Sequence, residues 1–454
     1  MNIPKTFEKY IEIYNKYSEE FSRNDTGKTS EERNKAFEKF KELGIPDNKD
    51  EDYKYTNIEE IFKINYEYIQ DAGKTFADLN EFFHCQVGNM DTHVVLLSNG
   101  AYYEKNRPIE NLPEGVIICG LNEAKHKYSD IFNKYYNNYP SESKDSFVAL
   151  NTMLANDGLF IYIPENTKLN KTIQLINLTH GFGNKNIFKR NLFIIGKNSE
   201  LSLIICDHTL NNSENFIVDV SESYIEENAN LRYYAIQNEH KKSAILNSHF
   251  INIEENSNAN SLILSLHGGI IRNNVFAKLS GEYSGANLYG LSLADKDQVV
   301  DNFTFIDHKV PNCTSNELYK SILDDSAKAA FSGRIVVRPD AQKTIAYQTS
   351  RSICLTPDAK IRTKPQLEIY ADDVKCSHGA TVGQLDEDAL FYLCSRGIDK
   401  KEARLMLMFA FANDILQEIN VKPLQERMSD LINSRLRGEL SDCCHCLLGC
   451  RNIE

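Results

Sequence analysis

The stretch that decides the fold is a short motif that the chain uses four times: Asn198-Ser-Glu-Leu201, Asn228-Ala-Asn-Leu231, Asn258-Ala-Asn-Ser-Leu262 and Gly285-Ala-Asn-Leu288. Each copy places a polar residue or glycine, a small residue and a polar residue before an apolar run with the composition of a β-strand. The first three copies start 30 residues apart, and the fourth starts 27 residues later. A related copy, Asp358-Ala-Lys-Ile361, lies downstream. A strand-and-turn unit that returns at a nearly fixed period indicates a solenoid.

The region around this motif, from about residue 147 to residue 384, consists of short β-rich runs separated by polar turns. Helical periodicity is absent there and paired hairpin turns do not join the runs, which favours a parallel β-helix over a β-sandwich. We therefore expect a mainly β protein with a central right-handed parallel β-helix; an irregular all-β domain is the alternative. The expected strands are 159–163, 192–195, 201–205, 231–236, 262–266 and 288–293.

Both flanks of this region carry helical patterns, so we expect domains with the bounds 1–146, 147–384 and 385–454. In the first domain, aromatic and apolar residues recur at helical spacing between residues 7 and 21. Thr29 with Glu32 has the pattern of a capping box for a second helix. A strand is expected over 94–98, with a hairpin at Asn99-Gly100.

The last domain is expected to contain three helices and a short tail. Asp386 is the expected N-cap of the first helix and Asp399 that of the second, and the third covers 424–436. The expected apolar stripe of the second helix consists of Ala403, Met406, Phe409, Ala412, Ile415, Leu416 and Ile419.

A thiol and an imidazole stand two residues apart at Cys376 and His378. If a strand that begins at Leu367 continues through them, both side chains project from the same face. A thiolate and an imidazole suit zinc, copper or iron bound with sulfide. Gly379 and Ala380 follow and screen the pair little. The pair is a candidate metal or cluster site; a buried cysteine and a hydrogen-bonded histidine are the alternative.

Other polar groups are weaker candidates. Asp372 and Asp373 would point to opposite faces of a strand, so they cannot share a proton there and are expected in a solvated turn or as interface charges. The tail Cys443 to Cys450 offers five soft ligands within eight residues. Its spacing is not that of a zinc site, so we expect free thiols. The pairs expected to be structural are His308 with Cys313 and Cys206 with His208.

Composition narrows the class of protein. The chain has 454 residues, 41% hydrophobic and 25% charged, with a net charge of −13. These are values of a soluble globular protein, and the acidic balance excludes nonspecific binding to nucleic acid. The amino end lacks the apolar core of a secretory signal and no apolar run is long enough to span a bilayer, so we expect a cytoplasmic protein without membrane contact. No P-loop motif occurs, so ATP hydrolysis by this chain is not expected.

Several segments together resemble a known family. The block Ala371-Asp-Asp-Val-Lys-Cys-Ser-His-Gly-Ala-Thr381 continues through Val382 to Asp386 and Leu390 to Ile398. Further matching segments are Gly44 to Asn57, Asp307 to Lys320, Phe331 to Val337 and Ala341 to Gln348. These segments resemble the SufB/SufD family, subunits of the SUF iron–sulfur cluster assembly scaffold, with Tyr53 where a Trp is common in the family. The intact Ala-Asp-Asp-Val-Lys-Cys-Ser-His block favours the SufD branch over the SufB branch.

The resemblance implies a scaffold subunit for iron–sulfur cluster assembly that is not itself an enzyme. It implies that His378 is a ligand of the cluster or of incoming iron, supported by Cys376, and that it faces a SufB-like paralogue across an interface of the two β-helices. The cluster would be transient, shared with the paralogue, and not bound stably by this chain alone; the isolated chain can form a homodimer instead. A SufC-like ABC ATPase would dock on the carboxy-terminal helices at Leu405, Met406, Met408 and Phe409.

Two other functions fit a β-helix. One is an enzyme that binds or cleaves polysaccharides along the solenoid groove. The absence of Trp, a common sugar-stacking residue, and of a secretory signal counts against it. The other is a self-associating structural β-helix without a cofactor.

Overall fold

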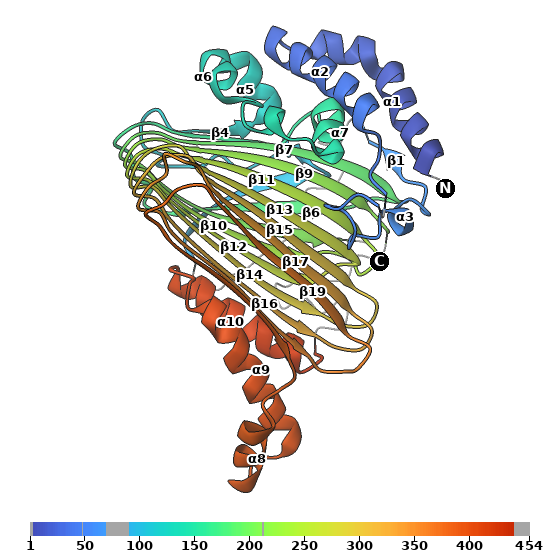
Figure 1. Ribbon diagram of the computed structural model, residues 1–454. Coiled ribbons are helices and arrows are strands. Elements are labelled where there is room, and N and C mark those ends of the chain that lie inside the picture. The colour runs from blue at the N-terminus through green and yellow to red at the C-terminus, as the bar shows by residue number, and fades with distance from the viewer. Residues whose placement is uncertain (1–2, 48, 70–89, 211–212, 440–454) are drawn as a thin grey trace.

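Two stacked parallel sheets form the centre of the computed structural model, which describes residues 3–47, 49–69, 90–210 and 213–439 (Figure 1). From β5 to β20 the odd-numbered strands form one sheet, here sheet A, and the even-numbered strands form sheet B. The chain thus crosses to the other sheet after every strand, which is the course of a parallel β-helix. The prediction of a central β-solenoid with helices on both flanks is confirmed.

The strands of the solenoid are mostly ten residues long. Those of sheet A are β5 (Leu159–Ile163), β7 (Lys185–Ile195), β9 (Phe216–Ile225), β11 (Ala244–Ile253), β13 (Ile270–Leu279), β15 (Val299–His308), β17 (Lys328–Val337) and β19 (Lys360–Ile369). Those of sheet B are β6 (Thr172–Thr179), β8 (Glu200–Thr209), β10 (Asn230–Asn238), β12 (Asn258–His267), β14 (Gly285–Ala294), β16 (Thr314–Leu323), β18 (Ile345–Cys354) and β20 (Lys375–Gly383).

Shorter strands extend both sheets at the amino-terminal end of the solenoid. β2 (Thr92–Ser98) pairs with β6 and forms a hairpin with β3 (Ala101–Tyr102), as the Asn99-Gly100 pair predicted. β4 (Ile117–Gly120) pairs antiparallel with β5, and β1 (Glu67–Tyr68) pairs with β7. Asn99 and Gly100 both have positive φ, 47° and 91°, which explains why this dipeptide makes the turn.

A column of left-handed turn residues explains the sequence repeat. From the turn after β5 to the turn after β17, the turns that lead from sheet A into the next strand of sheet B each contain one residue with φ between 55° and 63°. Asparagine tolerates this conformation best after glycine, and it recurs at most of these turns. The residues are Asn166, Asn198, Asn228, Asn256, Tyr283, Asn312 and Lys343.

The column also corrects the alignment of the repeat. Leu231 pairs in register with Leu201, as predicted, but it pairs with Ala259 rather than Leu262. The turn of the third copy therefore lies at Asn256, and Asn258 already belongs to β12. The sequence pattern was misread because Asn occurs both at the turn and at the start of the strand. Asp358 precedes β19, a strand of sheet A, so the last copy lies on the opposite edge of the solenoid.

Helices of the amino-terminal region cover the outer face of sheet A (Figure 1). They are α1 (Ile3–Asn24), α2 (Gly27–Leu43), α3 (Ile58–Ile61), α5 (Leu121–Lys127), α6 (Ser129–Tyr135), the 3-10 turn η1 (Pro140–Glu142) and α7 (Ser146–Leu154). Phe188, Phe216 and Leu246 of β7, β9 and β11 belong to the apolar core beneath them.

The predicted capping box of α2 was placed one turn too late. Thr26 is the N-cap, and its backbone N–H donates to Thr29 Oγ1 at 2.8 Å. Glu32 is buried instead and accepts a hydrogen bond from Asn137 Nδ2 at 2.6 Å. The carboxylate of Glu32 therefore binds Asn137 in the interior and does not cap the start of the helix.

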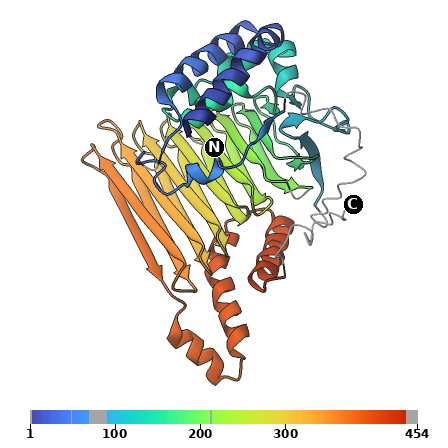
Figure 2. The ribbon, with the colours of Figure 1, turned by 90° about the vertical axis from the view of Figure 1, so that its right-hand side faces the viewer.

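The carboxy-terminal helices are α8 (Glu387–Ser395), α9 (Lys400–Leu416) and α10 (Lys422–Leu436). The last two pack on sheet B, on the side opposite to the amino-terminal helices (Figures 1 and 2). Asp386 and Asp399 cap α8 and α9 as predicted, accepting from the N–H groups of Ala389 and Lys401. α8 buries none of its residues and projects away from the solenoid.

The buried stripe of α9 differs from the predicted one. Leu405 and Met408 face the apolar outer surface of sheet B, together with Ala412, Ile415 and Leu416. Met406 lies on the outer side of the helix and is 44% exposed. Spacing along one helix leaves a choice between neighbouring faces, and contact with β14 and β16 makes that choice. Lys320 of β16 fastens the helix by donating to the carbonyl oxygen of Phe411 at 2.8 Å.

Within the described part of the chain, no helix is long and apolar enough to cross a bilayer.

Candidate functional site at the open end of the solenoid

The two sheets end at β19 and β20, each of which pairs with a neighbouring strand on one edge only. Figure 2 shows these last strands at the free edge, beyond the strands that the amino-terminal helices cover. All of β20 except Cys376 is exposed. Exposed apolar side chains, among them Ile369, Tyr370 and Val382, lie here. An unpaired edge offers backbone N–H and C=O groups to another chain, and exposed apolar side chains mark contact surfaces.

The structure places both members of the predicted thiol–imidazole pair on β20. Cys376 pairs in register with Ala346 of β18, and His378 with Gln348. Cys376 is half-buried against the apolar interior, whereas His378 is exposed at the open end. Cys376 and His378 lie two positions apart in one strand, so their side chains leave the same face. Burial raises the pKa of the Cys376 thiol, although the backbone of Ala346 acts in the opposite direction.

The route of the chain into this site differs from the prediction. The expected strand from Leu367 does not continue through the pair, because β19 ends at Ile369 and the chain crosses to sheet B before β20 begins. Asp372 and Asp373 lie exposed in this crossing turn. The N–H of Asp373 donates to Gln342 Oε1 at 2.9 Å, which holds the turn to the preceding one. A solvated turn, the predicted role of the two aspartates, is therefore what the structure shows.

Sequence reasoning missed an acid behind the pair. Glu317 of β16 pairs in register with Gln348, which itself pairs with His378. Glu317 is fully buried, and burial raises its pKa to about 7. Its position in the Asp307 to Lys320 segment gives no local sign of this, because burial in a solenoid comes from neighbours some thirty residues away.

The other predicted pairs have structural surroundings. His308 Nε2 is hydrogen-bonded to Ser315 Oγ at 2.9 Å, and burial lowers the pKa of His308 to about 4. Cys313 is buried next to Ser284 Oγ, 3.3 Å from its sulfur. Cys206 packs in the apolar layer beneath the carboxy-terminal helices, and His208 is buried. Among the described residues, no three His, Cys, Asp or Glu side chains are grouped so that they could hold a metal ion. The tail Cys443 to Cys450 lies outside the described residues.

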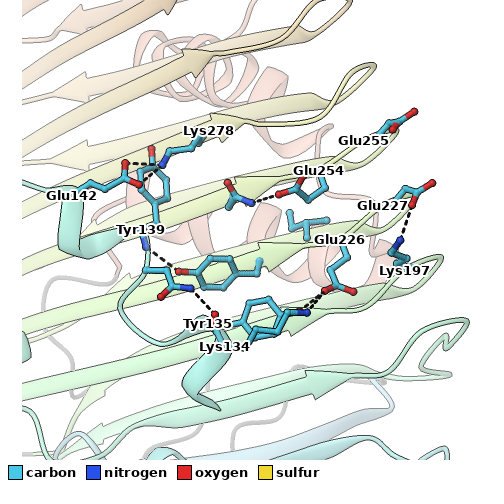
Figure 3. Close-up of a pocket in the computed structure, with 14 residues that line it drawn as sticks. Lys134, Tyr135, Tyr139, Glu142, Lys197, Glu226, Glu227, Glu254, Glu255 and Lys278 are labelled. Atoms are coloured by element: carbon cyan, nitrogen blue, oxygen red, sulfur yellow. Dashed lines mark hydrogen bonds and ion pairs between the residues drawn. The ribbon is translucent and has the colours of Figure 1, made fainter. Parts of the chain in front are cut away.

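A hollow of about 560 Å³ on the turn edge of the solenoid is rich in glutamate (Figure 3). Most of its carboxylates are engaged by neighbouring side chains. Glu227 pairs with Lys197 at 2.9 Å, and Glu142 with Lys278 at 2.7 Å. Glu226 accepts a hydrogen bond from the Tyr135 hydroxyl of α6. The contacts of Tyr135 and Glu142 hold α6 and η1 against the solenoid. The hollow therefore lies where the amino-terminal helices join the solenoid.

The residues predicted to contact an ATPase divide between two faces of α9. Leu405 and Met408 are buried against sheet B, Phe409 is half-buried, and Met406 is exposed. Two aromatic residues of α8, Phe391 and Tyr392, are exposed as well, Phe391 to 75%. Sequence reasoning missed them because an amphipathic pattern does not reveal that a short helix projects into solvent. Met406 with Phe391 and Tyr392 is here called the outer patch.

Two family models match the chain over most of its length. The model described as SUF system FeS cluster assembly, SufBD core domain, matches residues 177–411, and the SufBD protein N-terminal region matches residues 4–175. The iron–sulfur cluster assembly protein SufD of Escherichia coli is 27% identical over 415 residues, 90% of this chain and 94% of that protein. A SufBD family protein of Synechocystis is 29% identical over 403 residues, covering 87% and 88% of the two chains. A Staphylococcus aureus relative is 26% identical over 344 residues, covering 76% and 73%.

Proposed function

The chain belongs to the SufBD family of iron–sulfur cluster assembly proteins, and we propose that it is a non-catalytic scaffold subunit that assembles a cluster jointly with partner chains. The observation that carries this proposal is the open end of the solenoid. There a half-buried thiol and an exposed imidazole leave the same face of β20, the edge strand whose outer side is unpaired. Family membership leaves the alternative of a polysaccharide-binding or -cleaving protein without support.

The donor set argues for a shared site. Cys376 and His378 are two donors, and an iron–sulfur cluster takes four protein ligands. A second chain docked on the open end would bring its own donors to the same place. A SufB-like paralogue suits this role, because its β-helix can add strands to the free edges of β19 and β20.

The chemistry of the two donors suits a cluster that is made and then passed on. A neutral imidazole in place of a thiolate makes the cluster less negative, and its bond to iron is the weaker of the two. His378 is exposed and can meet incoming iron first. Burial raises the pKa of Cys376 and so favours its protonated thiol. The thiolate therefore forms when a metal ion binds and displaces the proton.

ATP hydrolysis in the proposed complex belongs to a SufC-like ABC ATPase that binds the carboxy-terminal helices. The outer patch supports this assignment, because exposed aromatic and methionine side chains make adaptable contacts. Leu405 and Met408 hold α9 in place beneath it. A contact on α8 and α9 would reach the open end directly, since α8 follows β20 after a few residues.

Co-expression with SufB-like and SufC-like chains tests the proposal. Anaerobic isolation should give one complex that contains all three chains and carries iron and sulfide, with the visible absorbance of a cluster. The chain expressed alone should carry little of either. A stable complex without iron and sulfide under conditions that load other SUF complexes would overturn the proposal.

Replacing Tyr370 by aspartate should weaken binding of the SufB-like partner at the open end. Tyr370 follows β19 and is 60% exposed, so the change removes an apolar contact without opening a cavity in the fold. We expect a loss of about tenfold or more in affinity, since a new charge would be buried at the contact. Phe182→Asp is the matched control: Phe182 is 99% exposed in the turn between β6 and β7, at the opposite end of the sheets. Equal binding by both variants would place the interface elsewhere.

A further inference from the structure

A buried carboxyl stands behind His378 in one column of inward-facing side chains. Glu317 on β16 pairs with Gln348 on β18, and Gln348 pairs with His378 on β20. Neighbouring strands lie about 4.8 Å apart, so the backbones of Glu317 and His378 are about 10 Å apart. The column leads from the exposed candidate ligand to a fully buried acid.

The contacts of Glu317 are hydrogen-bonding and apolar. Gln348 Nε2 donates to Glu317 Oε2. Gly333 on the facing sheet leaves the space for this contact, because a Cβ there would lie 2.3 Å from Gln348 Nε2. The side chains that act on the charge of the carboxyl are Gln348 on β18 and Thr304 on β15, and neither is charged. The titratable Tyr319 stands on its own strand, and Leu288 on β14 pairs with Glu317 in register.

The acid holds its proton near neutral pH. Burial raises the pKa of Glu317 to about 7, although the hydroxyl of Thr304 and the amide of Gln348 lower it. Glu317 Oε1 and Gln348 Oε1 have no hydrogen-bond partner among the described residues that meets strict geometric limits. A neutral carboxyl carries an O–H donor on one of its oxygens, whereas a carboxylate presents acceptors only.

We propose that Glu317 is the charge-compensating residue of the open end, which releases its proton to solvent when ferrous iron arrives at His378. The inference rests on the proposed function. In this step the neutral imidazole of His378 forms a bond to Fe²⁺, and the O–H bond of Glu317 breaks. The proton leaves to solvent and the carboxylate keeps the electron pair, so no oxidant or reductant is needed. Glu317 does not touch the iron; it is a positioning residue that acts through the electric field.

The linkage sets the sign of the pH dependence. Iron lowers the pKa of Glu317, so the iron-bound complex holds fewer protons and its affinity for Fe²⁺ rises as pH rises through the pKa of the free form. The 2+ charge of iron, about 10 Å from the carboxylate in a medium with an effective dielectric constant of about 20, lowers that pKa by about two. Between about pH 6 and about pH 8, Glu317 should therefore strengthen iron binding on the order of tenfold.

Fe²⁺ binding to the intact complex with its SufB-like and SufC-like partners tests this inference, measured without oxygen at the two pH values. Glu317→Gln keeps the shape of the side chain. In this variant, the rise in Fe²⁺ affinity between the two pH values should be about tenfold smaller than in the wild type. Glu239→Gln is the matched control. Burial also raises the pKa of Glu239 to about 7, but Glu239 follows β10, three strands farther from the open end. It should keep the wild-type pH dependence.

The outcomes separate this inference from the proposed function. Equal pH dependence in the wild type and Glu317→Gln overturns the inference alone. No Fe²⁺ binding by the wild type, or unchanged binding by His378→Ala, overturns the proposed function as well. If Glu317→Gln does not fold, infrared difference spectra of the wild type decide. Loss of the carbonyl stretch of a neutral buried carboxyl on Fe²⁺ addition, also seen in Glu239→Gln, supports the inference, and an unchanged band overturns it.

Discussion

Replacing His378 by alanine is expected to lower the iron and sulfide content of the assembled complex by at least about tenfold, while the complex still forms. The imidazole is exposed on the edge strand β20, so its removal leaves no cavity in the core and the free energy of unfolding should change little. What is lost is a donor that no neighbouring side chain on β20 replaces at the same face. Metal and sulfide analysis after anaerobic isolation measures the effect.

Ser377→Ala is the matched control for this variant. Ser377 lies between the two donors, is also exposed, and leaves the opposite face of the strand. It should keep the wild-type cluster content. A wild-type content in His378→Ala would show that the imidazole is no ligand, and failure of the complex to form would show that its role is structural.

The solenoid could be predicted from the sequence because its repeat is local. Asn198 and Asn228 adopt a left-handed conformation that few residues tolerate, so the turns impose residue types that recur in the sequence. The register could not be read to the residue. Asn256 and Asn258 are close together, and only the pairing of Asn230 with Asn258 shows which of them belongs to the strand. A strand that does not follow a left-handed turn residue, such as β11, had no such signal.

The candidate site was partly predictable for the same reason. Cys376 and His378 lie two residues apart, so their common face follows from strand geometry alone. Their place at an unpaired edge depends on where the solenoid ends, and Glu317 reaches the site only through the pairing of β16, β18 and β20. Contacts between successive coils join residues some thirty positions apart, and no local pattern in the chain marks them.

The packing of α9 separates residues that hold the helix on sheet B from residues that are free to contact the ATPase, which the sequence pattern had grouped together. Leu405 and Met408 pack on the outer face of sheet B, in one apolar cluster with Leu291 of β14 and Ile322 of β16. Removing residues 385–454 as a whole would uncover that apolar face and disturb the solenoid together with any partner contact. Point substitutions on the two faces of the helix distinguish docking from packing.

The double change Met406→Asp with Phe391→Asp should reduce binding of the SufC-like ATPase by at least about thirtyfold, because it puts two charges into the outer patch. Both side chains are exposed in this chain, so its thermal unfolding should stay as in the wild type.

Met408→Ala is the opposite case and the control. Met408 is 7% exposed against sheet B, and its truncation should lower the free energy of unfolding by about 2–5 kcal/mol. Calorimetric titration with the ATPase and thermal unfolding of each variant give the two readings. If the double variant binds the ATPase as the wild type does, the outer patch is not the docking surface. If instead it unfolds early, α8 and α9 contribute to stability through side chains that the structure shows exposed, and the division of α9 into a packing face and a docking face is wrong.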